Sequence, residues 1–195
     1  MIKIAVLASG NGSNAEQLVK NFKQTAGICV SLIVTNKADA FVLKRAARLD
    51  VPALYLSKEL LRNPAYIMKL FRKHQIDFII LAGWLKLIPK DLIHHFPKKI
   101  INIHPALLPK YGGKGMYGYH VHKAVIEAGE EESGISIHYV NERYDEGQII
   151  AQYTCAISET DTPDSLAEKI HQLEYAQYPE VCEGVIRKTF NLPLN

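Results

Sequence analysis

The feature that most constrains this chain is a regular alternation of short apolar runs with segments of helical periodicity. Residues 2–8 form a nearly continuous apolar run, which is typical of a strand buried on both faces of a sheet. Residues 13–24 follow, with Leu18, Val19 and Phe22 at helical spacing. A strand followed by a helix, repeated along a chain, predicts a mainly parallel, doubly wound, Rossmann-like sheet of the α/β class.

The alternation continues through the first half and changes character in the second. Further strands are expected at residues 28–35, 53–55, 77–81 and 98–103, and further helices at residues 39–49 and 64–73. Residues 135–140 alternate between apolar and polar side chains, and residues 148–156 form another strand after a short loop. These two segments predict an antiparallel C-terminal pair, and a long helix over residues 163–188 completes the fold.

The bulk properties fit one soluble domain. The chain has 195 residues, of which 48% are hydrophobic, and a net charge of +3, which is too mild to indicate a nucleic-acid partner. The N-terminus lacks the pattern of a signal peptide, and no apolar run is long enough to span a membrane. The cysteines, Cys29, Cys155 and Cys182, show neither disulfide nor metal spacing. We therefore expect a cytoplasmic protein with no metal and no membrane or nucleic-acid partner; the sequence carries no signal of an oligomeric state.

A glycine-rich segment lies directly between the first strand and the first helix. It reads Ser9-Gly10-Asn11-Gly12-Ser13-Asn14. Glycines let the backbone approach a ligand closely, and the helix N-terminus supplies free N–H groups and a positive dipole end. The segment predicts an anion site, most plausibly for a phosphate. Ser13 and Asn14 can also cap the helix.

The same segment fits the dinucleotide fingerprint, which leaves a nicotinamide cofactor as an alternative. That fingerprint expects an acidic residue at the end of the second strand, where this chain has Asn36 and Lys37 instead. Lys37 would suit the 2′-phosphate of NADP, so an NADP-dependent reductase stays open. A non-catalytic nucleotide-binding module would also explain the glycine segment, but not the polar residues that follow.

Asn102 and His104 are the most informative polar pair. They lie two residues apart at the carboxyl end of an apolar strand, so their side chains share one face. Ligands of α/β sheets bind at that end of the strands. The amide of Asn102 can donate to a developing oxyanion, and the imidazole of His104 can stabilise the same oxygen or move protons. The pair predicts acyl transfer; a histidine satisfied by backbone and a turn-forming asparagine are the alternative.

A second polar cluster occupies residues 141–147, between the two late strands. Such a loop is commonly solvated surface, but a carboxylate is also the natural partner of an active-site histidine. Asp145 would then raise the pKa of His104 and orient its ring.

Together these segments resemble the folate-dependent formyltransferases, and among them the phosphoribosylglycinamide formyltransferase family. The likeness spans essentially the whole chain. Four blocks carry it: residues 9–14, residues 36–40, residues 101–110 and residues 145–147. It implies a single domain over residues 1–195, with a phosphate-binding half at about 1–100 and a folate-binding and catalytic half at about 80–195.

The resemblance also implies roles for individual residues. Asn102, His104 and Asp145 match the catalytic trio, in which Asp145 keeps His104 charged and assists proton transfer. Gly12, Ser13 and Asn14 match the residues that hold the substrate phosphate. The residues that match the folate-binding segment, with Asn102 beside them, are Leu85, Lys86, Leu87 and Ile88.

Other positions match the family less directly. Glu174 matches a residue near the ribose hydroxyls, and the Leu108–Pro109 bond is expected to be cis. The family often has a folate-contacting arginine at the start of the third helix, where Arg62 and Asn63 compete in this chain. The segment 111–120 is longer and richer in glycine than is usual and reads as a mobile or a structural loop. His138 shares a face with Ser136, and His120 and His122 read as structural.

The implied reaction is transfer of the formyl group of 10-formyltetrahydrofolate, the co-substrate, to the amine of 5-phosphoribosylglycinamide. The products are formylglycinamide ribonucleotide and tetrahydrofolate, in de novo purine biosynthesis. Related activities remain as alternatives. A methionyl-tRNA formyltransferase would add a C-terminal RNA-binding domain, and a formyltetrahydrofolate hydrolase an N-terminal regulatory domain. A sugar-nucleotide formyltransferase would favour a base-binding pocket over a phosphate loop.

Overall fold

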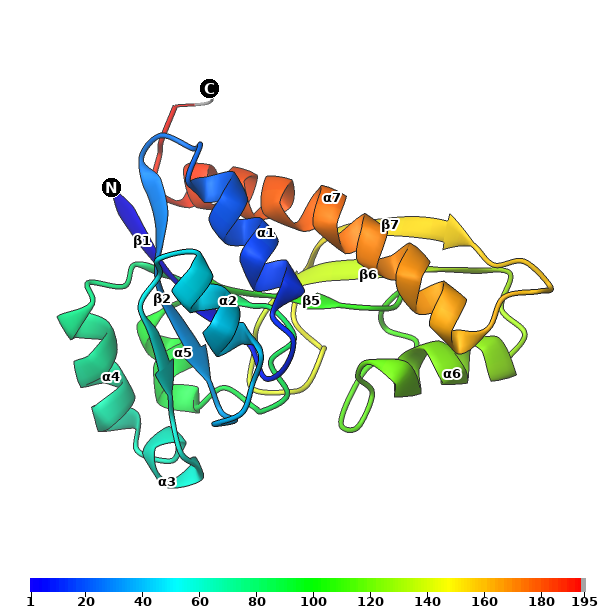
Figure 1. The fold of residues 1–195 in the computed structure, drawn as a ribbon, viewed down its shortest axis with the longest axis horizontal. Coiled ribbons are helices and arrows are strands. Elements are labelled where there is room, and N and C mark those ends of the chain that lie inside the picture. The colour runs from blue at the N-terminus through cyan, green and yellow to red at the C-terminus, as the bar shows by residue number, and fades with distance from the viewer. Residues whose placement is uncertain (194–195) are drawn as a thin grey trace.

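A seven-stranded mixed sheet organises the protein, which we describe over residues 1–193 from a computed structural model (Figure 1). The strands are β1 (Ile2–Leu7), β2 (Ile28–Thr35), β3 (Ala53–Tyr55), β4 (Phe78–Leu81), β5 (Ile100–His104), β6 (Glu132–Tyr139) and β7 (Ile149–Ala156). They lie in the order β3-β2-β1-β4-β5-β6-β7. Pairing is parallel from β3 to β5 and antiparallel from β5 to β7. The expected fold class is confirmed; residues 194 and 195 of the expected domain lie outside the described residues.

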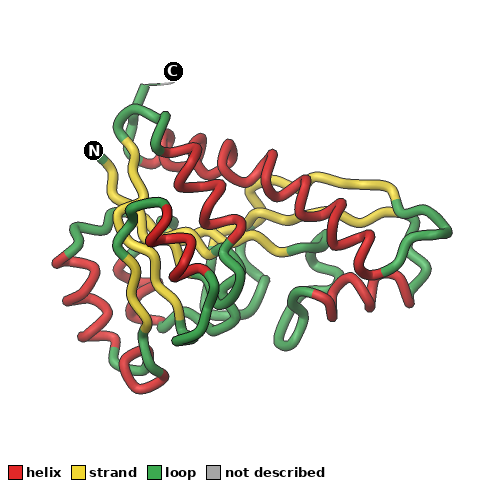
Figure 2. Tube along the Cα trace, viewed as in Figure 1, coloured by secondary structure: helices red, strands yellow, loops and turns green. Residues whose placement is uncertain are grey.

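Helices cover both faces of this sheet (Figure 2). They are α1 (Ser13–Phe22), α2 (Val42–Arg48), α3 (Lys58–Leu61), α4 (Pro64–Lys73), α5 (Lys90–His95), α6 (Tyr119–Glu127) and α7 (Pro163–Thr189). Buried side chains of α1, α2, α6 and α7 join one apolar cluster, and those of α4 and α5 join a second cluster on the opposite face. The strands are therefore buried on both sides, as their apolar runs indicate.

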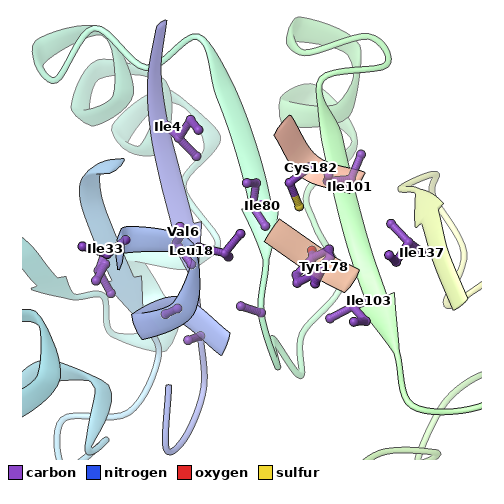
Figure 3. Close-up of a cluster of buried hydrophobic side chains, with 14 of the residues drawn as sticks. Ile4, Val6, Leu18, Ile33, Ile80, Ile101, Ile103, Ile137, Tyr178 and Cys182 are labelled. Carbon is purple, nitrogen blue, oxygen red and sulfur yellow. The ribbon is translucent and has the colours of Figure 1, made fainter. Parts of the chain in front are cut away.

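Alternate residues of each central strand feed the two clusters. Ile4 and Val6 of β1 pack with α1 and α7, whereas Ala5 and Leu7 pack on the other side. Figure 3 shows the first cluster, where isoleucines from β4, β5 and β6 surround Tyr178 of α7. Burial of this many aliphatic side chains is the main stabilising contribution to the fold.

Local signals fix the ends of the longest helix. Thr162 and Ser165 form a capping box at the start of α7, and Pro163 occupies the first turn, where its missing N–H costs nothing. Pro179 lies inside the helix. Next to it, the fully buried hydroxyl of Tyr178 donates to the carbonyl of Leu81 at 2.8 Å. This bond ties α7 to the carboxyl end of β4, where the candidate site lies.

Several helices differ from the sequence-based expectation, among them the short helix α3, which was not predicted. The second helix begins at Val42 rather than at residue 39, because Val42 N–H bonds back to the carbonyl of Gly10 and docks the helix start on the glycine-rich segment. Helix α6 was not predicted. Its apolar face rests on Val121 and Val125, and the polar side chains between them hide the periodicity in so short a segment. The Leu108–Pro109 bond is cis, as expected.

The Tyr178–Leu81 hydrogen bond provides a test of how α7 is held. Replacing Tyr178 by Phe leaves a buried carbonyl without this donor while keeping the ring, so we expect a loss of about 1–2 kcal/mol of unfolding free energy. Urea denaturation followed by circular dichroism measures it. The matched control is Tyr175→Phe on the same helix, at a partly exposed position, which should be neutral. Equal stability of both variants would show that the bond does not hold α7.

Candidate active site

One large cavity of about 740 Å³ opens at the carboxyl ends of the parallel strands. Its walls come from the segments that follow β1, β2 and β4, from β5 itself, from the loop before α6, from the β6–β7 loop and from α7. This is where open α/β sheets bind ligands. The cavity brings together the glycine-rich segment and the Asn102, His104 and Asp145 trio, which are far apart in the sequence.

The glycine-rich segment forms one end of the cavity. Gly12 is the N-cap of α1 with a left-handed φ of 76°, and no side chain caps the helix. A Cβ at Gly12 would lie 2.3 Å from Cγ2 of Val42, so only glycine lets α2 pack this closely. Arg45 of α2 donates to the carbonyl of Asn11 at 2.9 Å and fastens the loop from outside. The first N–H groups of α1 therefore meet no capping side chain, which leaves them available to an anion.

Asn14 does not cap the helix, as one reading of the sequence allowed, but bonds to α7. Its Nδ2 donates to Oε2 of Glu174 at 2.8 Å. Glu174 is only 7% exposed, and burial raises its pKa to about 7, although the bond from Asn14 opposes the shift. The structure thus places Glu174 in the cavity wall, in contact with Asn14 of the expected phosphate site.

The polar trio forms the other end of the cavity. Nδ1 of His104 lies 3.6 Å from Oδ2 of Asp145, and its Nε2 lies 2.8 Å from the carbonyl oxygen of Tyr111. A carbonyl only accepts, so Nε2 carries a hydrogen and donates. Asp145 has a left-handed φ of 55° and accepts from the N–H of Gly113 at 3.0 Å. The backbone of the glycine-rich segment 111–118 is thus fastened to both members of the pair.

Burial and charge act in opposite directions on this pair. Burial lowers the pKa of His104 more than the carboxylate of Asp145 and the carbonyl of Tyr111 raise it, so the net pKa lies below the ordinary value. Asp145 does raise the pKa of His104, as expected, but it does not raise it enough to offset burial. For Asp145, burial raises the pKa, whereas protonation of His138 or His104 and the N–H of Gly113 lower it. Asp145 is a carboxylate at neutral pH.

Two further histidines reach the site. His138 is 2% exposed, and its Nε2 lies 3.1 Å from Nδ2 of Asn102 and 3.7 Å from Oδ1 of Asp145. The antiparallel register brings it there, because Asn102 pairs with His138 across β5 and β6. His122 of α6 is buried in the cavity wall, and burial lowers its pKa to about 4. The alternation of residues 135–140 indicated which face of the strand His138 lies on, but not that it pairs with Asn102. No feature of the sequence pointed to His122.

The expected folate-binding residues divide between two places. Leu85 and Lys86 line the main cavity, and Leu85 N–H bonds to the Ser9 hydroxyl at 3.0 Å. Leu87 and Ile88 instead line a small apolar slot beside it, which shares Trp84 and Lys86 with the cavity. Arg62 is exposed at the end of α3 and lines neither space. The structure does not bring Arg62 to the site.

Several buried polar atoms of the cavity wall have no hydrogen-bond partner among residues 1–193. They are Oδ1 of Asn14, Oδ1 of Asn36, Nε1 of Trp84 and Nδ1 of His122. Each such atom costs free energy unless something bonds to it. Their gathering in one cavity fits a polar ligand. Within the described chain, no group of three or more His, Cys, Asp or Glu side chains is arranged to hold a metal ion, and no helix is long and apolar enough to cross a membrane.

Comparison with known proteins identifies the family. The family model for formyl transferases matches residues 2–182. This chain belongs to the formyl transferase family. It is 43% identical to the chloroplastic phosphoribosylglycinamide formyltransferase of Arabidopsis thaliana, over 94% of this chain and 65% of the plant protein's own length. It is 37% identical to the phosphoribosylglycinamide formyltransferase of Bacillus subtilis, over 95% of both chains.

Solved structures of the family have the same fold. The crystal structure of phosphoribosylglycinamide formyltransferase from Bacillus halodurans superposes with a TM-score of 0.87 at 32% identity, covering 99% of this chain and all of that one. The formyl transferase fold therefore extends over both the parallel and the antiparallel parts of the sheet.

The buried carboxyl of Glu174 generates a prediction for stability. Its pKa rises from 4.5 to about 7 on folding, because the buried site disfavours the charged form. The free energy of unfolding is therefore highest below pH 4.5 and falls as the pH rises through about 7. The full loss amounts to roughly 3 kcal/mol. We expect Glu174→Gln, which cannot ionise, to be clearly more stable than the unmodified protein at pH 8 and nearly equal to it at pH 5.

Thermal melts at both pH values measure this difference. Glu180→Gln, at an exposed position of the same helix, is the matched control and should change neither melt. An advantage of Glu174→Gln that is the same at pH 5 and pH 8 would contradict the assignment of a buried, ionising carboxyl.

Proposed function

We propose that this chain transfers the formyl group of 10-formyltetrahydrofolate to the amine of 5-phosphoribosylglycinamide. The products are formylglycinamide ribonucleotide and tetrahydrofolate, a step of purine biosynthesis. One observation carries the proposal: a single cavity is lined by the uncapped helix N-terminus that follows β1 and by the Asn102, His104 and Asp145 trio at β5, with β4 between the two strands. An acceptor with a phosphate and an amine at opposite ends matches that arrangement.

The anion site would hold the phosphate of the acceptor. Gly12, Ser13 and Asn14 would bind it through the N–H groups of the first turn of α1, where the helix dipole favours negative charge. Glu174, which Asn14 holds at the cavity wall through Oε2, is suited to a ribose hydroxyl because its other carboxyl oxygen can accept a hydrogen bond.

Formyl folate would supply an activated formyl group, and the residues around Trp84 fit it. Leu85 and Lys86 line the cavity with Asn102, and its volume of about 740 Å³ leaves room for a flat heterocycle beside a polar chain. Leu87 and Ile88 line the narrow apolar slot beside it and would form the apolar backing of this wall. Arg62 lines neither the cavity nor the slot, so we assign it no part in folate binding.

The folate-binding and catalytic half would then span about residues 80–195, and the phosphate-binding half about residues 1–100, of one domain. We place the reaction in the cytoplasm.

The polar trio would perform the transfer. Nε2 of His104, which donates to the Tyr111 carbonyl, is the donor that the formyl oxygen takes over as negative charge develops on it. Asp145 lies 3.6 Å from the other ring nitrogen and stabilises the charged imidazole during the step. Burial that lowers the His104 pKa makes it a stronger acid once protonated, and so a better proton donor near neutral pH.

The test is formylation by the purified protein with 10-formyltetrahydrofolate and 5-phosphoribosylglycinamide, with donor loss followed by absorbance and product by mass. Formylated product that depends on the acceptor is the expected result. Donor loss without acceptor would indicate a hydrolase. Formylation of an amino-sugar nucleotide instead would place the chain in the sugar-nucleotide branch, and stoichiometric NADPH binding with no transfer would favour a reductase.

The glycine-rich segment 9–14 provides a more specific test of acceptor binding. Gly12→Ala places a Cβ against Val42 at a left-handed φ and displaces the loop, so we expect the KM for the phosphorylated acceptor to rise about tenfold or more. Gly10→Ala is the matched control, because its Cβ meets nothing within 4 Å. Steady-state kinetics at varied acceptor concentration measures both. An equal KM in the two variants would place the phosphate elsewhere.

A further inference from the structure

Three polar side chains beside His104 share one hydrogen-bond network. Asn102 on β5 and Asp145 in the β6–β7 loop line the cavity, and the buried His138 on β6 contacts both of them. Nδ2 of Asn102 lies 3.1 Å from Nε2 of His138 and 3.4 Å from Oδ1 of Asp145. The positions of the hydrogens in this network decide whether the amide oxygen or the amide nitrogen of Asn102 faces the cavity.

The backbone fixes the tautomer of His138. Its Nδ1 lies 2.9 Å from the carbonyl oxygen of Tyr139, and a carbonyl can only accept, so Nδ1 carries a hydrogen. Gly147 lets this carbonyl lie where it does, since a Cβ there would come within 1.6 Å of the Tyr139 oxygen. In the neutral ring, the second nitrogen, Nε2, is then an acceptor.

The orientation of Asn102 follows from its two partners. The carboxylate of Asp145 and Nε2 of a neutral His138 both accept, and each takes one hydrogen of the Asn102 amide nitrogen. Oδ1 of Asn102 has no partner among residues 1–193 and is not a buried atom, so it is the atom that faces the cavity. This differs from the expectation that the amide nitrogen of Asn102 donates to an oxyanion, because both of its hydrogens are already used.

A charged His138 would reverse this arrangement. It would carry a hydrogen on Nε2, which would turn the amide oxygen of Asn102 towards His138 and the amide nitrogen towards the cavity. It would also draw the Asp145 carboxylate to about 2.7–2.9 Å, the length of a charge-assisted hydrogen bond. The observed distance from Nε2 to Oδ1 of Asp145 is 3.7 Å, which fits the neutral ring.

We propose that His138 is a positioning residue, which fixes the Asn102 amide with its oxygen towards the attacking amine of the acceptor. This rests on the proposed function. The amine nitrogen bonds to the formyl carbon, the bond from that carbon to the folate nitrogen breaks, and one proton passes from the amine to the folate nitrogen. Asn102 neither gains nor loses a proton. Its oxygen accepts one N–H of the amine, which aims the nitrogen lone pair at the carbon, while His104 serves the formyl oxygen.

Two isosteric variants separate this role from a structural one. His138→Gln retains an acceptor near the position of Nε2, whereas His138→Asn retains a donor near Nδ1 for Tyr139 but offers Asn102 no acceptor. We expect kcat to fall about tenfold or more in His138→Asn with KM little changed, and to be largely rescued in His138→Gln. Equal losses in two folded variants would overturn the proposal.

A direct measurement needs no turnover, so it separates failure of this inference from failure of the proposed function. Long-range ¹H–¹⁵N correlation spectra of the ¹⁵N-histidine-labelled protein at neutral pH report the protonation of each ring nitrogen, and the signals that His138→Gln removes identify His138. A neutral ring protonated at Nδ1 is the expected result. A ring protonated at Nε2, or at both nitrogens, would overturn the proposal and return the donor role to Asn102.

Discussion

The buried carboxylate of Asp145 is the interaction on which the rest of the site depends. It lies between His104 and His138, accepts from Asn102 and receives the backbone N–H of Gly113. Its side chain is 12% exposed, and the hydrogen bonds from Asn102 and Gly113 offset the desolvation of a carboxylate so enclosed. Its left-handed backbone aims the side chain inward. One charge therefore orients groups from a strand pair and two loops at once.

The mixed sheet brings that carboxylate and the glycine-rich segment 9–14 to one cavity. The parallel strands direct the glycine-rich segment 9–14 to their carboxyl ends, where an uncapped helix start faces the cavity. The sheet then turns antiparallel at β5, which pairs with β4 on one side and β6 on the other. Asn102 and His104 lie on this boundary strand. The formyl transferase fold thus brings the uncapped helix start after β1 and the polar trio at β5 to one cavity, with β4 between the two strands.

Sequence predicted what depends on local pattern and missed what depends on register. The apolar runs gave the strands, and residues 163–188 gave the long helix, because burial on a sheet and helical periodicity are both local. The sequence placed His138 on one face with Ser136 but did not show that it contacts Asn102, because that contact is set by the pairing of β6 with β5. Arg62 was expected at the site from resemblance alone, and the chain places it at an exposed helix end. The balance of burial against charge at His104 also required the packed structure.

The most direct test of this account is the formyl-transfer rate of Asp145→Asn as a function of pH, with folding checked by circular dichroism. An amide keeps the shape of the side chain but removes the charge that orients His104 and Asn102. We expect kcat to fall about a hundredfold or more, and the pH profile to differ from that of the unmodified protein. A folded variant with an undiminished rate and an unchanged pH profile would contradict it.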